Sequence, residues 1–499
     1  MPAAPTKPDK LSPVSALLLQ GGDDRIRLLD GKTFNKYGCR PYPVADCIDF
    51  SSSTASHVSA STYGALELLR HRLSETVSNA SPEQVYAHEL QQLRTRFLSL
   101  WNLSPSKMEM IFSASGTDAH LIAASLVQTL HDASLHAIMI QCEESGSGVA
   151  AALCGQPFSS CTATGDVPPA RVAAAAGTTM IHIDLRAPDG SARPSAQVDA
   201  DFEQAASRVL EQGLPAMLVA VDVSKTGLAA PSMDAVARLK NRWGSQLTVL
   251  VDACQFRIDS AALHAYLQLG CMVAITGSKF FAAPSFCGAL LIPSALAKAM
   301  QSQSMPALLR SYSSGAEWPA NWRGTNELAR VPNMGLLLRW EAALQEMQNF
   351  LRVPREDAHR IMSACAAAIQ ERLSSDPHFR PLDNSAVASN KPATIHAFIP
   401  CRPAPDRKML ERSEVERLYR ALQNTVQADG RTYLLGQPVQ CGGPGSSPAW
   451  ALRLCLSAPL IVNAYGNGNG DGSNEDGLNG LIEQTLVCLT AVAATIDQL

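Results

Sequence analysis

The chain has 499 residues, of which 46% are hydrophobic and 17% are charged, and its formal net charge is -4 at pH 7. This length allows a large core, and the weak negative charge argues against nucleic acid and anionic membranes as partners. The apolar run at 14–19 is too short for a signal peptide, and no uninterrupted apolar stretch reaches the roughly 18 residues of a spanning helix. We therefore expect a soluble, cytoplasmic protein.

The 13 cysteines are an odd number, lie mostly in apolar surroundings, and form no CxxC pair. Such cysteines are typical of reduced, buried thiols rather than of disulfides or zinc ligands. We expect no metal site.

Residues 1–80 are rich in Pro, Gly and Ser and predict an extended arm that leads into a first helix. The stretch 81–103 then predicts a helix, with apolar residues at Val85, Leu90, Leu93, Phe97 and Leu100. Ser81 precedes it, and Gln84 occupies the third helical position, which together form the pattern of a capping box.

Short apolar, β-rich runs then alternate with Ala- and Leu-rich stretches of helical length. The runs span 108–113, 136–142, 178–184, 216–223, 247–253, 272–277 and 288–293. Runs that are apolar on both faces and joined by helices predict a mostly parallel sheet covered on each side. We assign residues 81–345 to one large α/β domain built on a seven-stranded sheet.

Residues 346–499 predict a smaller α+β domain, preceded by a long helical segment near 333–351. It combines a helix at 356–373, strand-like runs at 393–400 and 449–458, and a closing helix at 478–496. The Gly- and Asn-rich stretch 463–477 predicts a flexible surface loop; no Lys-Ser/Thr pair follows it, so we assign it no phosphate.

Candidate site residues follow the strands, because ligands of open α/β sheets bind beyond the carboxyl ends of the strands. Ser115, Gly116 and Thr117 form a small-residue turn between a strand and a helix. Such a turn points backbone N–H groups and the positive helix end at one spot, which suits a phosphate. The same residues also suit an ordinary helix cap.

Asp252 ends the apolar run 247–253, and Lys279 follows the run 272–277 among phenylalanines. A buried carboxylate is costly without a partner, and a desolvated lysine is a nucleophile for carbonyl groups. Taken singly, a structural ion pair and a snorkelling lysine explain these residues equally well.

Taken together, the anion turn, Asp252 and Lys279 resemble pyridoxal-phosphate (PLP) enzymes of the aspartate-aminotransferase-like fold, known as fold type I. The stretch 218–255, which ends in DACQ, resembles the class V aminotransferase and cysteine desulfurase branch. The resemblance implies that Asp252 pairs with the pyridine nitrogen, and that Gln255 and Ser224 face the ring hydroxyl. Lys279 would hold the cofactor as a Schiff base and carry the proton at the substrate Cα.

Three further matches extend the resemblance. Thr276 and Ser278 stand where the family contacts the phosphate or its surroundings. Gly324 and Thr325 match a GT pair that reaches the phosphate of the neighbouring subunit, which implies a homodimer with shared active sites. Arg453, in 449–458, matches the arginine that binds the substrate carboxylate, a role suited to its planar fork of donors.

Two departures weaken the desulfurase interpretation. Ser278 stands where many desulfurases have histidine, and the loop 311–323 has no cysteine to take up sulfur. The ring-stacking position has no aromatic residue, which leaves Glu144 or Ser145 near the ring. Tyr37, Arg40 and Tyr63 are candidates for the pocket border, although arm packing explains each of them as well.

We therefore expect a PLP-dependent enzyme acting at the Cα of an α-amino acid, first of all an aminotransferase. A lyase, decarboxylase or carbon–carbon bond-forming enzyme of the same fold is the alternative, because all these reactions begin alike. A non-catalytic protein of this fold is the remaining interpretation.

Overall fold

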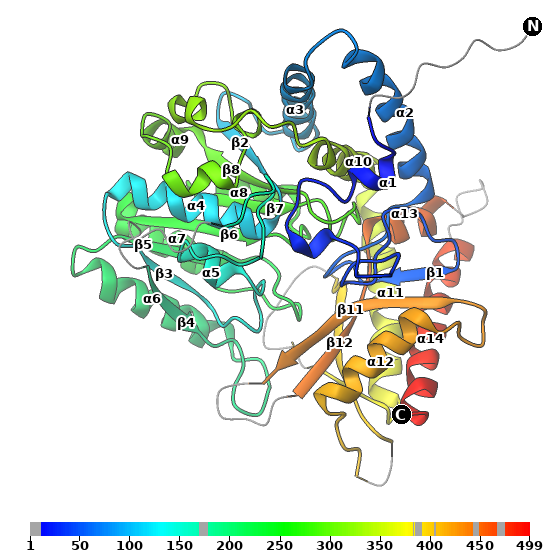
Figure 1. Cartoon of the computed structure of the whole chain (residues 1–499). Coiled ribbons are helices and arrows are strands. Elements are labelled where there is room, and N and C mark those ends of the chain that lie inside the picture. Colours follow the sequence, from blue (N-terminus) through cyan, green and yellow to red (C-terminus); the bar gives the residue numbers. More distant parts are fainter. Residues whose placement is uncertain are drawn as a thin grey trace, which may run out of the picture.

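The computed structural model describes residues 11–168, 178–382, 384, 392–403, 406–442, 449–466 and 475–499. It contains a seven-stranded sheet and a five-stranded sheet with helices packed around them (Figure 1).

The seven-stranded sheet has the strand order β2-β8-β7-β6-β5-β3-β4. Its strands are β2 (Met108–Ser113), β3 (His136–Ile140), β4 (Thr179–Ile183), β5 (Ala216–Val221), β6 (Leu247–Ala253), β7 (Met272–Thr276) and β8 (Gly288–Pro293). Strand β8 runs antiparallel to β2 and β7, and the other pairings are parallel. The seven predicted runs all form strands of this sheet, so the predicted mostly parallel sheet is confirmed.

Both faces of this sheet are covered, which explains why its strands β5 to β8 are buried at every residue. In β5, Leu218 joins one hydrophobic cluster, while Met217 and Val219 join the other. One cluster includes residues of α4 (Gly116–His131), α5 (Val149–Leu153) and α9 (Ser294–Met300). The other includes residues of α3 (Pro82–Leu100), α6 (Ser195–Leu210), α7 (Met233–Trp243), α8 (Ser260–Gln268) and α10 (Met334–Leu351).

Helix α3 begins as the sequence predicts. The Ser81 hydroxyl accepts from the Gln84 amide at 3.2 Å, and the Gln84 side-chain oxygen accepts from the Ser81 amide at 3.4 Å. Both halves of the capping box are present, which satisfies two amides that the helix leaves unpaired.

The five-stranded sheet has the order β1-β11-β12-β10-β9. Its strands are β1 (Cys47–Phe50), β9 (Phe379–Pro381), β10 (Ile395–Pro400), β11 (Thr432–Cys441) and β12 (Ala449–Cys455). The predicted runs at 393–400 and 449–458 contain β10 and β12. Strand β1 comes from the expected arm and pairs in parallel with β11, so that Cys47 lies opposite Thr432.

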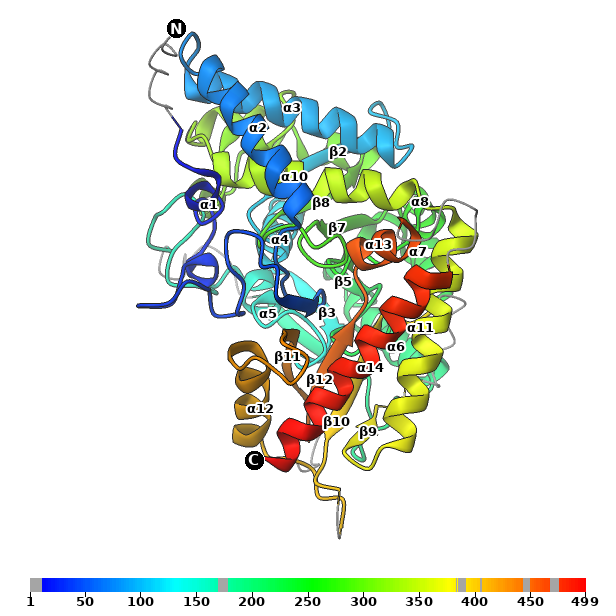
Figure 2. The ribbon, with the colours of Figure 1, turned by 90° about the vertical axis from the view of Figure 1, so that its right-hand side faces the viewer.

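Helices α11 (Arg355–Ser375), α12 (Arg412–Asn424), α13 (Ala458–Gly466) and α14 (Glu475–Asp497) accompany this sheet, and α11 and α14 run side by side (Figure 2). Of the predicted loop 463–477, residues 463–466 end α13 and 475–477 begin α14. Residues 467–474 lie outside the described residues.

Helix α14 is long and apolar enough to cross a membrane by length and composition, with a mean hydropathy of 1.3 in its most apolar window. Half of that window is buried inside the protein, and α14 packs against α11, α12 and α13. The expectation of no such helix rested on uninterrupted apolar runs, a stricter criterion than mean hydropathy.

The arm also contains α1 (Val14–Leu17), the 3-10 helix η1 (Asp24–Ile26) and α2 (Ala60–Thr76), and it docks on α10. The buried Arg339 guanidinium of α10 donates to the carbonyls of Leu18, Gln20 and Gly21 at 2.7–3.1 Å. A Cβ at Gly335 would lie 2.3 Å from the Gln20 carbonyl, so the close approach of the arm requires glycine there.

Candidate active site

A cavity of about 280 Å³ lies at the carboxyl ends of β5, β6 and β7. Residues from both sheets and from the arm line it. Most of the predicted site residues are among them, namely Ser115, Gly116, Thr117, Asp252, Gln255, Thr276, Ser278, Lys279 and Arg453. The structure therefore brings together residues that lie up to 338 positions apart (115 to 453).

The anion turn begins α4 and opens into the cavity. The Ser115 hydroxyl accepts from the Asp118 amide at 3.2 Å and caps the helix. A Cβ at Gly116 would lie 2.6 Å from the Cys254 sulfur, so only glycine lets this turn approach the strand ends so closely. The Thr276 hydroxyl, beside the turn, donates to the Cys254 carbonyl at 2.6 Å. The helix start can receive an anion through its free amides.

Asp252 remains ionised although it is buried. One of its oxygens accepts from the Cys254 amide at 3.0 Å, and the other lies 3.5 Å from Nε2 of His120. Burial raises the pKa of Asp252, but His120, Lys279 and the Cys254 amide outweigh burial and hold this pKa well below its usual range. Asp252 therefore presents a carboxylate that can pair with a cationic or hydrogen-donating group in the cavity.

His120 positions Asp252 and was not found from the sequence. Its Nδ1 donates to the Gly116 carbonyl, 2.7 Å away, while Nε2 faces Asp252 and is buried without a hydrogen bond. Burial lowers the pKa of His120, but the charge of Asp252 and contacts with Asp252 and Gly116 raise it overall. His120 lies four residues after Gly116, which places it one helical turn further along α4. This spacing was the signal in the sequence that could have identified His120.

Lys279 extends into the same cavity from the turn after β7. Burial lowers the pKa of the Lys279 amine below its usual value, although Cys254 and Asp252 act in the opposite direction. Phe286 lines the same cavity, whereas Phe280 and Phe281 are buried outside its lining. A lysine in this setting loses its proton more readily than one in water, as a nucleophilic amine requires.

Arg453, on β12, is a buried cation without an acidic partner among the described residues. Its Nη2 donates to the Thr54 hydroxyl and the Gln437 carbonyl, both at 2.9 Å. Burial lowers the pKa of Arg453, which reflects the cost of keeping this charge away from water. Carbonyl and hydroxyl oxygens compensate a guanidinium only partly, so the cavity favours an anion beside it.

Lys225 is a second cation that the sequence interpretation missed. It lines the cavity, and its Nζ lies 3.4 Å from the Cys142 carbonyl. Burial and the charge of Arg453 lower the pKa of Lys225 to about 8, although Glu144 acts in the opposite direction. In the sequence Lys225 is only a lysine after strand β5. Lysines in such places are usually exposed, so nothing distinguished this one.

Three predicted residues differ from what the resemblance implies, either in their partners or in their place. Gln255 lines the cavity, but its amide already donates to the Ser53 carbonyl at 3.1 Å and accepts from Arg257 at 2.8 Å. Ser224 is not among the lining residues; its hydroxyl donates to Glu144 at 2.8 Å. Thr325 lies in η5 (Arg323–Glu327), away from the cavity of its own chain, and donates to the Trp322 carbonyl at 2.8 Å.

Glu144 lines the cavity. It lies near the ring-stacking position of the family, where this sequence has no aromatic residue. The buried Arg186 pairs with its carboxylate at 2.8 Å, and Ser224 and Thr226 donate to it at 2.8 Å. These bonds occupy the carboxylate oxygens of Glu144, so it forms a fixed wall of the cavity.

Ligand atoms of His120, Asp252 and Cys254 lie within 4.8 Å of one another, as in a metal site. Burial raises the pKa of the Cys254 thiol well above its usual value, whereas a metal ligand must be a thiolate. In this structure His120 Nε2 and the Asp252 carboxylate lie 3.5 Å apart and face each other.

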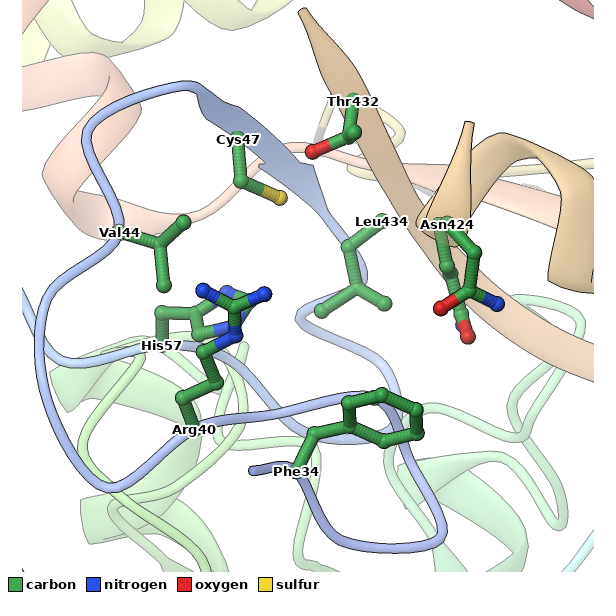
Figure 3. Close-up of a pocket in the computed structure, with 10 residues that line it drawn as sticks. Phe34, Arg40, Val44, Cys47, His57, Asn424, Thr432 and Leu434 are labelled. Carbon is green, nitrogen blue, oxygen red and sulfur yellow. The ribbon is translucent and has the colours of Figure 1, made fainter. Parts of the chain in front are cut away.

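Of the three candidates for the pocket border, Tyr37 lines this cavity. Arg40 instead lines a separate hollow of about 30 Å³ beside β1 and β11, which His57 also lines (Figure 3). Tyr63, on α2, lines neither hollow.

No family model and no curated protein matches the chain by sequence. Solved structures match it over most of its length. The cystine C–S lyase C-DES, in complex with its product cysteine persulfide, is 17% identical, with 87% of this chain and 96% of that chain covered and a TM-score of 0.52.

Two other solved structures also match most of this chain. A NifS-like protein from Rickettsia africae is 10% identical, with 89% and 99% covered and a TM-score of 0.53. The Oryza sativa protein TDC, solved with PLP and tryptamine, is 13% identical, with 90% and 84% covered and a TM-score of 0.50. At these identities the similarity concerns the fold, and it confirms the aspartate-aminotransferase-like fold that the sequence resemblance implied.

Proposed function

We propose that this protein, which has the fold of the PLP-dependent fold type I enzymes, binds PLP and acts at the Cα of an α-amino acid. The observation that carries the proposal is one cavity faced by an ionised Asp252, a desolvated Lys279 and the start of α4. An aldehyde, a pyridine nitrogen and a phosphate of one cofactor match these groups.

The cofactor-holding residues divide by the part of PLP they face. Ser115, Gly116 and Thr117, with Thr276 and Ser278, lie at the phosphate end. Asp252 pairs with the pyridine nitrogen, and the His120 contact at 3.5 Å keeps the Asp252 carboxylate in place. When bound, PLP supplies an electron sink for the negative charge that develops at the substrate Cα.

Lys279 has two tasks in this proposal. Its amine would hold the aldehyde carbon of the cofactor, and the same amine would hold and return the proton at the substrate Cα. A lowered pKa serves both tasks, because a neutral amine attacks carbonyl carbon and accepts protons.

Arg453 binds the substrate α-carboxylate in this proposal. Its guanidinium faces the cavity with no acidic partner among the described residues, and the Gln437 carbonyl and Thr54 hydroxyl fix its plane. A carboxylate matches the remaining edge of the planar fork. Substrate orientation would thus depend on β12, which carries Arg453.

Amino-group transfer is the first candidate reaction. A PLP-dependent lyase, decarboxylase or carbon–carbon bond-forming enzyme is the alternative. We also propose a cytoplasmic homodimer in which Gly324 and Thr325 reach the phosphate in the partner's site. Neither Gly324 nor Thr325 is among the residues that line the cavity of their own chain, which leaves this role to the partner's site.

Lys279→Ala tests the proposal. We expect wild-type protein to take up PLP with a visible absorbance, and the variant to lose that absorbance while its circular dichroism stays unchanged. Arg453→Ala should keep the absorbance and weaken amino-acid binding about tenfold or more, because a charged hydrogen bond is lost. A wild-type protein that takes up no PLP would contradict the proposal.

Product analysis separates the candidate reactions. Wild-type protein loaded with PLP is mixed with single amino acids. Accumulation of pyridoxamine phosphate and a keto acid indicates transfer, whereas released sulfide, ammonia or carbon dioxide with unchanged PLP indicates the alternative. The Arg453→Ala variant serves as the control for reactions that do not use the proposed carboxylate site.

A further inference from the structure

The N-terminal arm brings one arginine to the anion turn. Arg25, in η1, lines the cavity although it lies 90 residues before Ser115. Its Nη2 donates to the Ser115 hydroxyl at 3.2 Å, and its Nη1 lies 3.5 Å from the Thr117 hydroxyl. These hydroxyls belong to the turn where the proposed cofactor phosphate lies.

The guanidinium of Arg25 is held from three sides. Asp23 accepts from its Nε at 2.9 Å and orients one edge of the fork. The Phe286 ring centroid lies 4.5 Å from the Arg25 Cζ, within cation–π range, and the Phe158 centroid lies 5.9 Å away. The other edge, toward Ser115 and Thr117, is thereby aimed at the start of α4.

Arg25 stays charged in this setting. Burial lowers the pKa of the Arg25 guanidinium, but the contacts with Asp23 outweigh burial and raise it above its usual value. Of the other cationic or basic side chains that line the cavity, Lys225 bonds to the Cys142 carbonyl and Arg453 to the Gln437 carbonyl, while His120 donates to the Gly116 carbonyl of the turn. Among the described residues, Arg25 is the cation that donates to the two hydroxyls of the turn, those of Ser115 and Thr117.

The arm that carries Arg25 is fixed to the body of the protein. Arg339 binds three carbonyls of the arm, and the Asn333 side chain donates to the Gly21 carbonyl at 2.9 Å. Arg25 is therefore positioned before any ligand binds, which limits the entropy lost on binding.

We propose that Arg25 binds the phosphate group of the cofactor, so that the arm completes the anion site at the start of α4. This inference rests on the proposed function. A phosphate dianion gains from a planar cation more than from neutral amides and hydroxyls, because the hydrogen bonds become charge-assisted. Arg25 should therefore distinguish PLP from pyridoxal, which has the same ring and aldehyde but no phosphate.

The test titrates cofactor-free protein with PLP and with pyridoxal and compares the two dissociation constants. We expect Arg25→Ala to weaken PLP binding about tenfold or more and to leave pyridoxal binding within about twofold. Arg25→Lys should recover part of the loss, since it restores a charge without the fork. Arg27→Ala, which removes an exposed arginine of the same arm, is the matched control and should change neither constant.

Two results would overturn the inference. Equal weakening of PLP and pyridoxal by Arg25→Ala would mean that Arg25 only supports the cavity wall, and unchanged PLP binding would mean that it does not reach the phosphate. A wild-type protein that binds neither compound would instead refute the proposed function itself. Thermal melting of each cofactor-free variant identifies any loss of fold.

Discussion

Lys225 and Lys279 face the same cavity, and their surroundings separate their roles. Lys279 lies near Asp252 and Cys254 at the strand ends, whereas Lys225 lies near Arg453 and the Cys142 carbonyl. Lys225 is therefore on the side where we place the substrate carboxylate. Two cations there favour a substrate with more than one negative group.

The charge of Lys225 gives a pH prediction. Because burial and Arg453 lower its pKa to about 8, Lys225 is mostly charged at pH 7 and loses its charge as the pH rises through 8. We expect KM for an acidic amino acid to rise several-fold between pH 7 and 9 in wild type. In Lys225→Met we expect KM to be higher than in wild type at pH 7 and to change little over the same pH range. Lys240→Met, at a site outside the cavity, is the control. An unchanged pH profile in Lys225→Met would contradict this role.

The sequence predicted the candidate site residues near the ends of strands. Asp252 stands at the end of β6 and Lys279 in the turn after β7, so their convergence at one sheet edge could be expected before the structure was known. His120 had only its spacing from Gly116 as a signal, and Arg25 had none. The direction of His120 depends on the exact phase of α4, and the position of Arg25 depends on the path of an irregular arm.

At the scale of elements, the seven runs predicted the strands of the large sheet but not their order. The order β2-β8-β7-β6-β5-β3-β4 and the reversed β8 depend on pairings between distant strands, which periodicity within one run cannot show. Strand β1 has four residues and pairs with β11, so it lacked both the length and the local partner that make a strand recognisable.

The docking of the arm on α10 gives a prediction at this scale. Arg339→Met keeps the apolar stem but removes the donor of the Leu18 and Gln20 carbonyls, and it leaves the Gly21 carbonyl with Asn333 alone. Removing one partner of a buried hydrogen-bond network typically costs about 2–4 kcal/mol of unfolding free energy. We expect the variant to become sensitive to proteases near the arm, as mass spectrometry of the fragments would reveal.

Arg339→Met should also weaken PLP binding, because the arm carries Arg25. Arg352→Met, at the other end of the same helix, is a control that leaves the arm contacts intact. If the arm of Arg339→Met resists proteases as well as the wild-type arm does, other contacts suffice to dock the arm.

At the scale of the whole molecule, β1 joins the beginning of the chain to its last third. Asp49 of β1 accepts from the His57 amide at 2.8 Å, and its carboxylate lies 3.3 Å from the His57 ring. Burial lowers the pKa of His57, but Asp49 and Cys47 raise it to about 9. This pair lies beside the hollow that Arg40 lines (Figure 3).

The raised pKa predicts a pH-dependent stability. An unfolded histidine has a pKa of about 6.5, so the contribution of His57 is fully present below pH 6.5 and is lost as the pH rises through 9. We expect the difference in unfolding free energy between wild type and His57→Asn to fall by about 1–3 kcal/mol over this window. Urea denaturation at several pH values measures it, with the exposed His88→Asn as control.

The pairing of Cys47 with Thr432 also has a consequence for synthesis on the ribosome. Strand β1 emerges early, yet its partner β11 is translated hundreds of residues later. During that interval the hydrogen-bonding edge of β1 has no native neighbour, and contacts of such long sequence separation slow folding. Chaperones that shield exposed strand edges should therefore raise the yield of this protein, and fragments that end before β11 should aggregate.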